Sequence, residues 1–508
     1  MVFSSEAPDD TVHKVSVMKK RREAMKVCGF FFLLSMFSPF LDANPGIKVK
    51  ITQKGLDYGI QCGVDLLQQR LKEEIFEDMS GQETYGFSGV DYTVSKIQVN
   101  SVEFPNTSVS LIPGIGINLL INDARATVNA NWKVRSWLFR SSGKLTVFIS
   151  GVFLTAIVTA SQDNAGHTVL LLESCQGNVG GIDIELDQEA GWMYKYFVNF
   201  LEKPTCISLT TNMCPYIGFE IERINAELKQ RQVRAQIDSF ARVDYSLVNS
   251  LSISKASINL DIKGTVYPVG NDTEPPFKPK PFIIPEKNNS MIHIGISEYF
   301  LQSASLVYYA SGAFDVSIAK ELSSYFRLTT KAFGSSIPKV ARRYATPYPV
   351  ILNLKPIAAP VIGLHNDSFV LEAAGSMEVL AVLPNSTTQS MFTLNITAIT
   401  RASLTIFEQK LIPSLCLDSF HLSLAHSNVG FFKVSLLKNF FSYILRNGVI
   451  PAANAKLKEG LRLLETDSMM LVEPVVTVHQ AYLLISTDLA YNVEEDQGES
   501  EEFFTIDA

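Results

Sequence analysis

Hydrophobic positions follow the same order twice along this chain. In the first half, Ile47, Val49 and Ile51 alternate with polar residues as in a strand, and apolar residues at helical spacing come next. The helical part contains Asp57 to Gly63, which matches Glu298 to Ala304 in register as acid, Tyr, any residue, aliphatic, Gln, small, small. The second copy also follows a short apolar run. We therefore interpret the chain as two copies of one ancestral unit.

A second repeated pattern consists of adjacent apolar pairs every four residues. The pairs are Trp192/Met193, Tyr196/Phe197 and Phe200/Leu201 in the first half, and Leu436/Leu437, Phe440/Phe441 and Ile444/Leu445 in the second. This spacing produces an apolar face wider than a surface helix needs. The pattern predicts a long, deeply buried helix in each half, and in the second half we expect it to extend from Val434 to Leu461.

Strand-like alternation fills most of the remaining chain. Apolar and polar residues alternate in short runs, broken by turn residues, between Val90 and Val158 and again between Val350 and Phe407. Antiparallel strands combined with the predicted helices indicate an α+β architecture in both halves.

A proline-rich segment divides the two halves. Residues 272–285 contain five prolines, which exclude a helix or a central strand and favour extended polyproline II. A chain of 508 residues is also too long for one ordinary hydrophobic core. We expect an N-terminal domain at 44–270, a semi-rigid linker at 271–290 that holds two bodies apart, and a C-terminal domain at 291–492.

The first 43 residues are typical of a targeting segment. Five Lys and Arg residues within positions 19–26 precede an apolar run from Val27 to Phe37, and Ala43 offers a small residue at a cleavage edge. This predicts a signal peptide with an N-terminal extension at 1–43, and hence secretion. A signal anchor and a true start at Met25 are the alternatives. Although 46% of the chain is hydrophobic, it contains no run of 18 apolar residues, so we expect no membrane-spanning segment.

Six Asn-x-Ser/Thr sequons agree with an extracellular compartment. They begin at Asn106, Asn271, Asn288, Asn366, Asn385 and Asn395. We expect glycosylation at these asparagines, two of which flank the linker.

Three of the six cysteines compete for one disulfide. Cys175 ends a strand-like run and Cys214 precedes Pro215 at the start of a helical pattern, so a bridge between them would join a sheet to a helix. We favour this pairing. Cys206 is the rival partner, and the spacing alone leaves that alternative open.

Charge is concentrated at the C-terminus. The net charge is −7, and residues 493–508 carry seven acids and no base. The rest of the chain is therefore close to neutral, so we do not expect nucleic acid as a partner. We interpret 493–508 as a solvated, disordered tail, with a regulatory role as the alternative.

One short segment combines aromatic and basic residues. Its members are Trp132, Lys133, Arg135, Trp137 and Arg140. Such a mixture is suited to a lipid interface or to phosphate, so we predict a hairpin tip that docks on anionic surfaces. A half-buried strand with exposed bases is the alternative. The acidic stretch from Lys72 to Glu83 would instead repel phosphate.

Motifs that carry catalysis are missing from the sequence. It contains no Gly-x-Ser-x-Gly, no phosphate-binding loop and no His-Glu-x-x-His. His421 and His426 are five positions apart in strand-like sequence, so they face opposite sides of a strand and form a poor metal pair. We expect neither enzyme activity nor a metal site.

Several motifs along the chain occur together. They are Asn44-Pro45-Gly46-Ile47, Gly55-Leu56-Asp57-Tyr58, the Cys175/Cys214 spacing, Pro275-Pro276-Phe277 and Ala381-Val382-Leu383-Pro384-Asn385-Ser386. In combination they resemble the family of bactericidal/permeability-increasing protein (BPI) and lipopolysaccharide-binding protein (LBP), whose wider relatives transfer phospholipid and cholesteryl ester. Residues 289–300 and 483–489 are most similar to the branch named BPI fold-containing family C. The resemblance covers residues 44–492.

The resemblance implies a particular fold. It implies a boomerang of two duplicated barrel-like domains, each a highly twisted antiparallel sheet wrapped around a long helix, joined by a central sheet and the Pro-rich linker. It also implies a bridged cysteine pair and an apolar pocket for acyl chains in each domain. Relatives that kill bacteria carry lysines at the amino-terminal tip, where this chain has Glu73, Glu74, Glu77, Asp78 and Glu83. Bactericidal activity is therefore not expected.

With this resemblance, the apolar helix faces become candidate pocket walls. The candidates are Leu56, Ile60, Val64, Trp192, Tyr196 and Phe200 in the first half, and Tyr299, Leu436, Phe440 and Ile444 in the second. Each of them could instead be an ordinary core residue.

The resulting expectation is a secreted, monomeric, non-enzymatic lipid-binding protein. It would hold the acyl chains of phospholipid or lipopolysaccharide, contain bound phospholipid rather than a cofactor, and dock on an anionic membrane or micelle surface. One alternative is an innate-immune recognition or scaffold protein that acts through a protein receptor, with lipid only structural. An esterase is a further alternative for which no residue is in view.

Overall fold

The computed structural model describes residues 44–85, 88–137, 140–163, 165–187, 194–287, 289–314, 328–463 and 469–491. The predicted signal peptide at 1–43 and the predicted tail at 493–508 lie outside these ranges. Antiparallel sheets make up most of the described chain, and a smaller number of helices pack against them.

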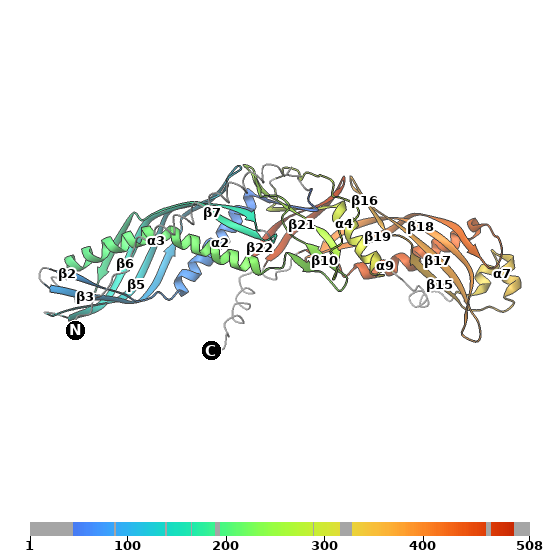
Figure 1. Cartoon of the computed structure of the whole chain (residues 1–508), viewed down its shortest axis with the longest axis horizontal. Coiled ribbons are helices and arrows are strands. Elements are labelled where there is room, and N and C mark those ends of the chain that lie inside the picture. The colour runs from blue at the N-terminus through green and yellow to red at the C-terminus, as the bar shows by residue number, and fades with distance from the viewer. Residues whose placement is uncertain are drawn as a thin grey trace, which may run out of the picture. The chain divides into compact units, whose positions relative to one another are not determined.

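The N-terminal half contains a seven-stranded sheet (Figure 1). Its strands are β2 (Met79–Tyr85), β3 (Ser88–Glu103), β4 (Asn106–Ile112), β5 (Gly116–Ser136), β6 (Arg140–Gln162), β7 (Thr168–Asn178) and β8 (Gly181–Leu186). Their order is β2-β3-β5-β6-β7, with β4 paired to β5 and β8 paired to β6. The long central pair, β5 and β6, ends in a hairpin where Arg135 lies opposite Arg140.

Two helices contact different parts of this sheet. Helix α2 (Gln53–Glu73) contacts β3 and β4, whereas α3 (Tyr194–Gln230) contacts β7 and β8 and runs along the sheet in Figure 1. In the strand order, β5 and β6 lie between the strands that the two helices contact.

Helix α3 is longer than the sequence predicted. The sequence predicted a helix at the apolar pairs up to Leu201 and a separate helical pattern near Pro215, but the structure has one helix of 37 residues with Pro204 and Pro215 in its interior. Each proline removes a backbone hydrogen bond and crowds the preceding turn, at about 3 kcal/mol. Packing on β7 and β8, together with a disulfide at Cys214, holds the helix across these positions.

A six-stranded central sheet combines strands from both halves. Its strands are β1 (Ile47–Thr52), β11 (Ser252–Ile253), β12 (Ser257–Ile262), β14 (Ile292–Ser297), β21 (Met469–His479) and β22 (Tyr482–Tyr491). The order is β11-β12-β1-β14-β22-β21, so the two halves are joined where β1 pairs with β14. A three-stranded sheet adjoins it in sequence, with β10 (Ala241–Asp244) between β9 (Arg234–Gln236) and β13 (Thr265–Pro268).

The repeat found in the sequence corresponds to two strand-to-helix units. Strand β1 leads into α2, and β14 leads into α4 (Glu298–Ala310). The side chain of Thr52 accepts a hydrogen bond from Gly55 N, and that of Ser297 accepts one from Phe300 N, so each helix has the same kind of N-cap. The repeated motif starts at the fifth residue of α2 but at the first residue of α4, and it is therefore displaced by about one helical turn.

The proline-rich linker does not hold two bodies apart. Phe282 and Ile284 are buried against Tyr482 and Leu484 of the central sheet. The buried Lys50 Nζ donates to the carbonyl oxygens of Ile284 and Pro285 at 3.2 and 3.3 Å. The expectation of a spacer was wrong because alternate side chains of this extended segment are apolar and find a sheet surface to cover.

The C-terminal half has a six-stranded sheet of its own. Its strands are β15 (Val350–Pro356), β16 (Val361–His365), β17 (Ser368–Val382), β18 (Thr388–Phe407), β19 (Lys410–Ser427) and β20 (Leu461–Arg462). Their order is β15-β17-β18-β19-β20, with β16 paired to β17. Within the described ranges, this sheet and the N-terminal one begin and end on different strands, so neither is a closed barrel.

The long helix predicted for the C-terminal half is interrupted. It consists of a 3-10 turn η2 (Val434–Leu437), α8 (Lys438–Ile444), a π-helical turn η3 (Leu445–Val449) and α9 (Ile450–Leu457). The helical run stops before Gly460, whose φ of +65° favours glycine, rather than continuing to Leu461. Two short helices, α6 (Thr330–Gly334) and α7 (Pro338–Arg343), cover the same core.

Candidate functional site

Several apolar side chains on α2 and on the central strands of the N-terminal half are only half-buried. Along α2, the candidate residues Leu56, Ile60 and Val64 face the sheet side but remain half-buried, and none of the residues of this helix is fully buried. Val128 and Val147, which pair across β5 and β6, are also only half-buried. Apolar surface between the helices and the central strands is thus left without a protein partner that covers it fully.

Helix α3 closes the other side of this interior. Trp192 lies outside the described residues, and the side chains of Tyr196 and Phe200 also lie outside the description. Their neighbours Val198 and Leu201 are buried in a small cluster with Ala130, Trp132, Val134, Leu145 and Ile184. A second small cluster, around Ile121, Ala124 and Leu154, forms farther along the same sheet.

The C-terminal end of α2 interacts electrostatically with α3. Burial raises the pKa of the Tyr216 hydroxyl on α3, and the carboxylates of Glu220 and Glu74 raise it further. Glu74 is the C-cap of α2, so the end of α2 lies within electrostatic range of the middle of α3. Leu56, Ile60 and Val64, which are half-buried, lie in the turns of α2 that precede its C-terminal end.

A disulfide fastens α3 to the sheet. Cys175 on β7 is bonded to Cys214 on α3, with their Cα atoms 5.7 Å apart, and Cys206 is free. This is the pairing that the sequence favoured over the rival Cys206. The bridge joins the element that covers the interior to the strand beside it.

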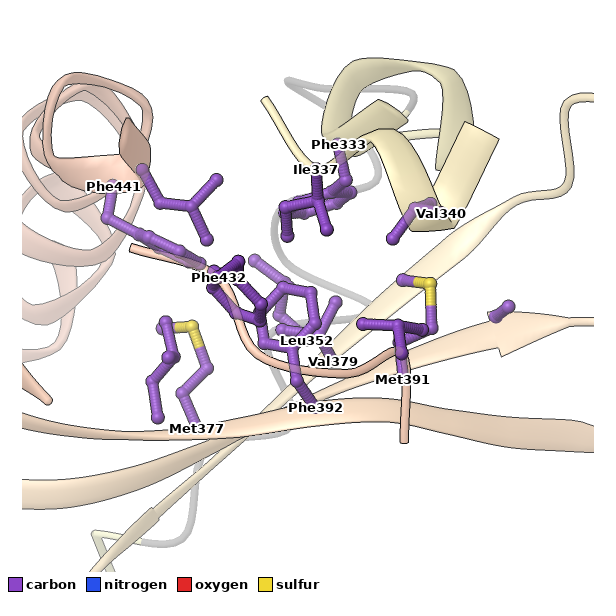
Figure 2. Packing of buried hydrophobic residues seen from close by; sticks show 14 of the residues in the cluster. Phe333, Ile337, Val340, Leu352, Met377, Val379, Met391, Phe392, Phe432 and Phe441 are labelled. Atoms are coloured by element: carbon purple, nitrogen blue, oxygen red, sulfur yellow. The ribbon is translucent and has the colours of Figure 1, made fainter. Parts of the chain in front are cut away.

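The interior of the C-terminal half is packed much more tightly (Figure 2). Phe333, Phe392 and Phe441 are fully buried, and the ring centroids of Phe333 and Phe392 are 5.7 Å apart. Figure 2 shows these rings converging with Met377, Met391 and Phe432 between the helices and the sheet. Aromatic and thioether side chains fill the space here without help from another molecule.

The four pocket candidates of this half occupy different environments. Ile444 is only 1% exposed within the aromatic cluster, and the ring of Phe440 packs on Phe333 with centroids 4.8 Å apart. The structure does not place Leu436 and Tyr299 beside Ile444 and Phe440. Leu436 is 55% exposed, and Tyr299 is buried at the start of α4 with its hydroxyl 2.9 Å from Thr265 Oγ1.

The basic and aromatic segment is the hairpin between β5 and β6. Alternation along β5 places Trp132 in the core, where it is 3% exposed, and places Lys133 and Arg135 on the outer face. The prediction that Trp132 belongs to the docking tip was therefore wrong. Arg140 is exposed opposite Arg135, and Trp137 at the turn is 79% exposed. The described residues of the hairpin therefore present the cations Lys133, Arg135 and Arg140 and the aromatic ring of Trp137 to solvent.

The strand register adds residues that sequence reasoning missed. Asp91 on β3 lies directly opposite Arg135, and its Oδ1 accepts a hydrogen bond from Gln82 Nε2 at 2.9 Å. Lys144 is exposed on the same face of β6 as Arg140, and its backbone N–H donates to Asp187 Oδ2 at 2.9 Å. Asp91 thus borders the hairpin cations on one side, whereas the carboxylate of Asp187 lies beside Gly143 on the other face of β6. These neighbours of the hairpin could be identified only from the pairing of strands that are distant in the sequence.

The predicted glycosylation sites are distributed over both halves. Asn106, Asn271, Asn366, Asn385 and Asn395 are exposed, and Asn288 lies outside the described residues. Asn271 and Asn385 begin local turns in which the side-chain oxygen accepts from a Thr two residues later. Glycosylation at these asparagines remains a prediction.

Two features are absent from the residues that the structure describes. No group of three or more His, Cys, Asp or Glu side chains there is arranged to hold a metal ion. In the same ranges, no helix combines the length and hydrophobicity needed to cross a membrane.

Comparison with known proteins adds independent information. The profile described as "LBP / BPI / CETP family, N-terminal domain" matches residues 55–231, and the profile for the C-terminal domain matches residues 235–491. The chain is 36% identical to BPI fold-containing family C protein of Homo sapiens over 474 residues, 92% of this chain and 94% of that one.

Two further proteins are similar over nearly the whole chain. Bactericidal permeability-increasing protein of Sebastes schlegelii is 31% identical over 472 residues, which cover 92% of this chain and 100% of that protein. The crystal structure of lipopolysaccharide binding protein matches with a TM-score of 0.60 at 25% identity, covering 89% of this chain and 100% of that one.

Proposed function

The chain belongs to the LBP / BPI / CETP family, and from this premise we propose that it is a secreted protein that holds acyl chains in an apolar pocket and docks on anionic lipid surfaces. Members of this family bind lipids and are not enzymes. The relatives named above include proteins that bind lipopolysaccharide. The proposed ligand is therefore the acyl part of phospholipid or lipopolysaccharide.

One observation carries the proposal, namely the half-buried apolar face of α2. Leu56, Ile60 and Val64 are only half-buried, and α2 has no fully buried residue, whereas the C-terminal half has a large buried cluster that includes Phe333, Phe392 and Phe441. Exposed apolar surface of this extent is unfavourable unless a ligand or partner covers it. An acyl chain between α2, α3 and the strands β5 and β6 would cover it. Tyr196 and Phe200 of α3, and Trp192 before this helix, are the further candidates for the walls around it.

The magnitude of the hydrophobic effect indicates how such a ligand enters. Burial of a chain of about 14 methylenes gains about 11 kcal/mol relative to water, at about 0.8 kcal/mol per methylene. Two chains would exceed the practical limit of noncovalent affinity. The lipid must therefore pass between apolar phases while the protein is docked on a lipid surface. The cations and Trp137 of the β5–β6 hairpin supply that contact in the proposal.

A second pocket in the C-terminal half is part of the same proposal but needs a rearrangement. Phe440 and Ile444 pack in the aromatic cluster, so an acyl chain could enter there only if the ring of Phe440 moved away from Phe333. Tyr299 and Leu436 would then have to approach from outside that cluster. We accordingly assign the first acyl chain to the N-terminal half.

The test is the lipid content of the protein purified from cells that secrete it. Native mass spectrometry with lipid extraction should find phospholipid bound to the intact chain. Ile60→Trp should lower the lipid content, because the larger side chain occupies the proposed space. Ile207→Trp is the matched control, since it adds the same bulk at an exposed position of α3. Lipid-free protein that stays lipid-free with vesicles would refute the proposal and favour a receptor or scaffold role.

A further inference from the structure

The C-terminal half carries a surface of unusual composition. This surface lies at the end of the sheet that is opposite the β19–β20 pairing. Three segments meet there, residues 328–350, 383–396 and 426–449. Arg343 Nη1 donates to Asn428 O at 2.9 Å, and Asn428 N donates to Met391 O at 2.9 Å, so the segments are in direct contact. Together they contain seven Lys and Arg residues and no Asp or Glu.

An aromatic side chain projects from the middle of this surface. Gly430 has a φ of +80°, and this turn sends consecutive phenylalanines in opposite directions. Phe432 is buried, with its ring centroid 5.0 Å from that of Phe392 in the core shown in Figure 2. Phe431 points away and is 82% exposed. The exposed ring of Phe431 is thus adjacent to the tightly packed aromatic cluster of the C-terminal half.

Cations surround the exposed ring. The side chain of Lys339 on α7 lies against Gly430, and Arg343 on the same helix reaches Asn428. Lys433 follows Phe431 by two residues and is exposed. Arg342 is exposed beside Arg343. We call Lys339, Arg342, Arg343, Phe431 and Lys433 the distal basic surface.

No carboxylate of the three segments balances these charges. The acid nearest in sequence among the strands of this core is Glu378 on β17, whose neighbours Met377 and Val379 are fully buried. Because successive strand residues point to opposite faces, Glu378 lies on the outer face of the sheet, away from the core side where α7 packs. Leu436, three residues after Lys433, adds a second exposed apolar side chain.

We propose that the distal basic surface is a second docking site of this protein, and that its partner is an anionic lipid surface. The headgroup layer of a membrane accepts an exposed aromatic ring, and the negative charge of anionic lipids attracts the surrounding cations. A protein partner would instead call for a larger complementary area than one aromatic ring among exposed cations provides. This inference does not depend on acyl-chain uptake, which the proposed function places in the other half.

The test measures sedimentation of the full-length protein with vesicles of phosphatidylcholine containing 30% phosphatidylglycerol at low salt. The background variant is Arg135→Glu/Arg140→Glu, so that the β5–β6 hairpin does not hide the effect. In this background, Lys339→Glu/Lys433→Glu should weaken binding by about 25-fold or more, since each cation near an anionic surface contributes about fivefold. Binding to vesicles of pure phosphatidylcholine should stay weak for every variant.

Two controls separate docking from folding and from net charge. Lys355→Glu/Lys458→Glu introduces the same charge change at exposed positions outside the three segments, and should change binding by less than about threefold. Phe431→Trp should shift its emission to shorter wavelength when anionic vesicles are added, because the ring enters the interface. A reduction caused equally by both double variants, or an unshifted Trp emission, would overturn the proposal. Lipid content measured by mass spectrometry reports separately on acyl-chain uptake.

Discussion

The interiors of the two halves differ although both place helices on an antiparallel sheet. In the C-terminal half, one cluster of aromatic, aliphatic and Met side chains closes around Phe333 and Phe441. In the N-terminal half, the buried residues form small separate clusters, and α2 has none that is fully buried. The duplication therefore preserved the path of the chain but not the filling of its core. A repeated architecture can be stabilised by its own side chains in one copy and leave apolar surface for a ligand in the other.

The largest test of this difference is a pair of truncations. Phe441→Ala should lower the free energy of unfolding by about 3–5 kcal/mol, because it leaves a cavity among rings that cannot collapse. Leu56→Ala should cost about 1 kcal/mol in lipid-free protein, since the side chain is already half-exposed. Urea unfolding followed by circular dichroism measures both. Equal losses at the two positions would mean that the interiors are filled alike.

The disulfide should matter in the N-terminal half alone. Cys175 and Cys214 close a loop of 39 residues, and the chain-entropy estimate for such a bridge is about 4 kcal/mol. Cys175→Ser/Cys214→Ser should therefore increase amide hydrogen exchange in β7 and α3 while leaving β17 and β18 unchanged. Cys416→Ser is the matched control, because this free cysteine is exposed on β19. Faster exchange in both halves would show that they unfold as one unit.

The sequence was informative where a local pattern determines the structure. Alternation predicted strands between Val90 and Val158, where β3 to β6 lie, and the apolar period after Ile51 predicted the helix that is α2. The strands and the helix depend on neighbours within a few residues. The favoured cysteine pair was also correct, although the spacing alone had left Cys206 open as a partner.

Other features depend on packing between distant segments, and the sequence could not supply them. Tertiary contacts keep α3 helical through Pro204 and Pro215, against the local preference. The wide apolar face near Phe440 predicted a helix beside a pocket, but residues from α6 and β18 fill that space. Periodicity shows that a face is buried, and it cannot say whether protein or lipid buries it.

The hairpin of the N-terminal half gives a smaller effect than the truncations. Arg135→Glu/Arg140→Glu should weaken binding to vesicles containing 30% phosphatidylglycerol by about 25-fold at low salt, because two exposed cations become anions at the contact. The loss should shrink as ionic strength rises, since salt screens exposed charges. Unchanged sedimentation of this variant would exclude the hairpin as a docking site.

The smallest expected effect tests whether a neighbouring carboxylate offsets the positive charge of each basic surface. Asp91 lies opposite Arg135, whereas the distal basic surface has no acid among its three segments. Asp91→Asn removes one negative charge beside the hairpin while keeping an oxygen that can accept from Gln82, and should strengthen binding to the same vesicles by about two- to fivefold. Glu378→Gln makes the same change on the outer face of β17 and should leave binding nearly unaltered. If the Glu378 variant instead gained as much as the Asp91 variant, vesicle binding would follow the net charge of the protein rather than charges at a defined contact.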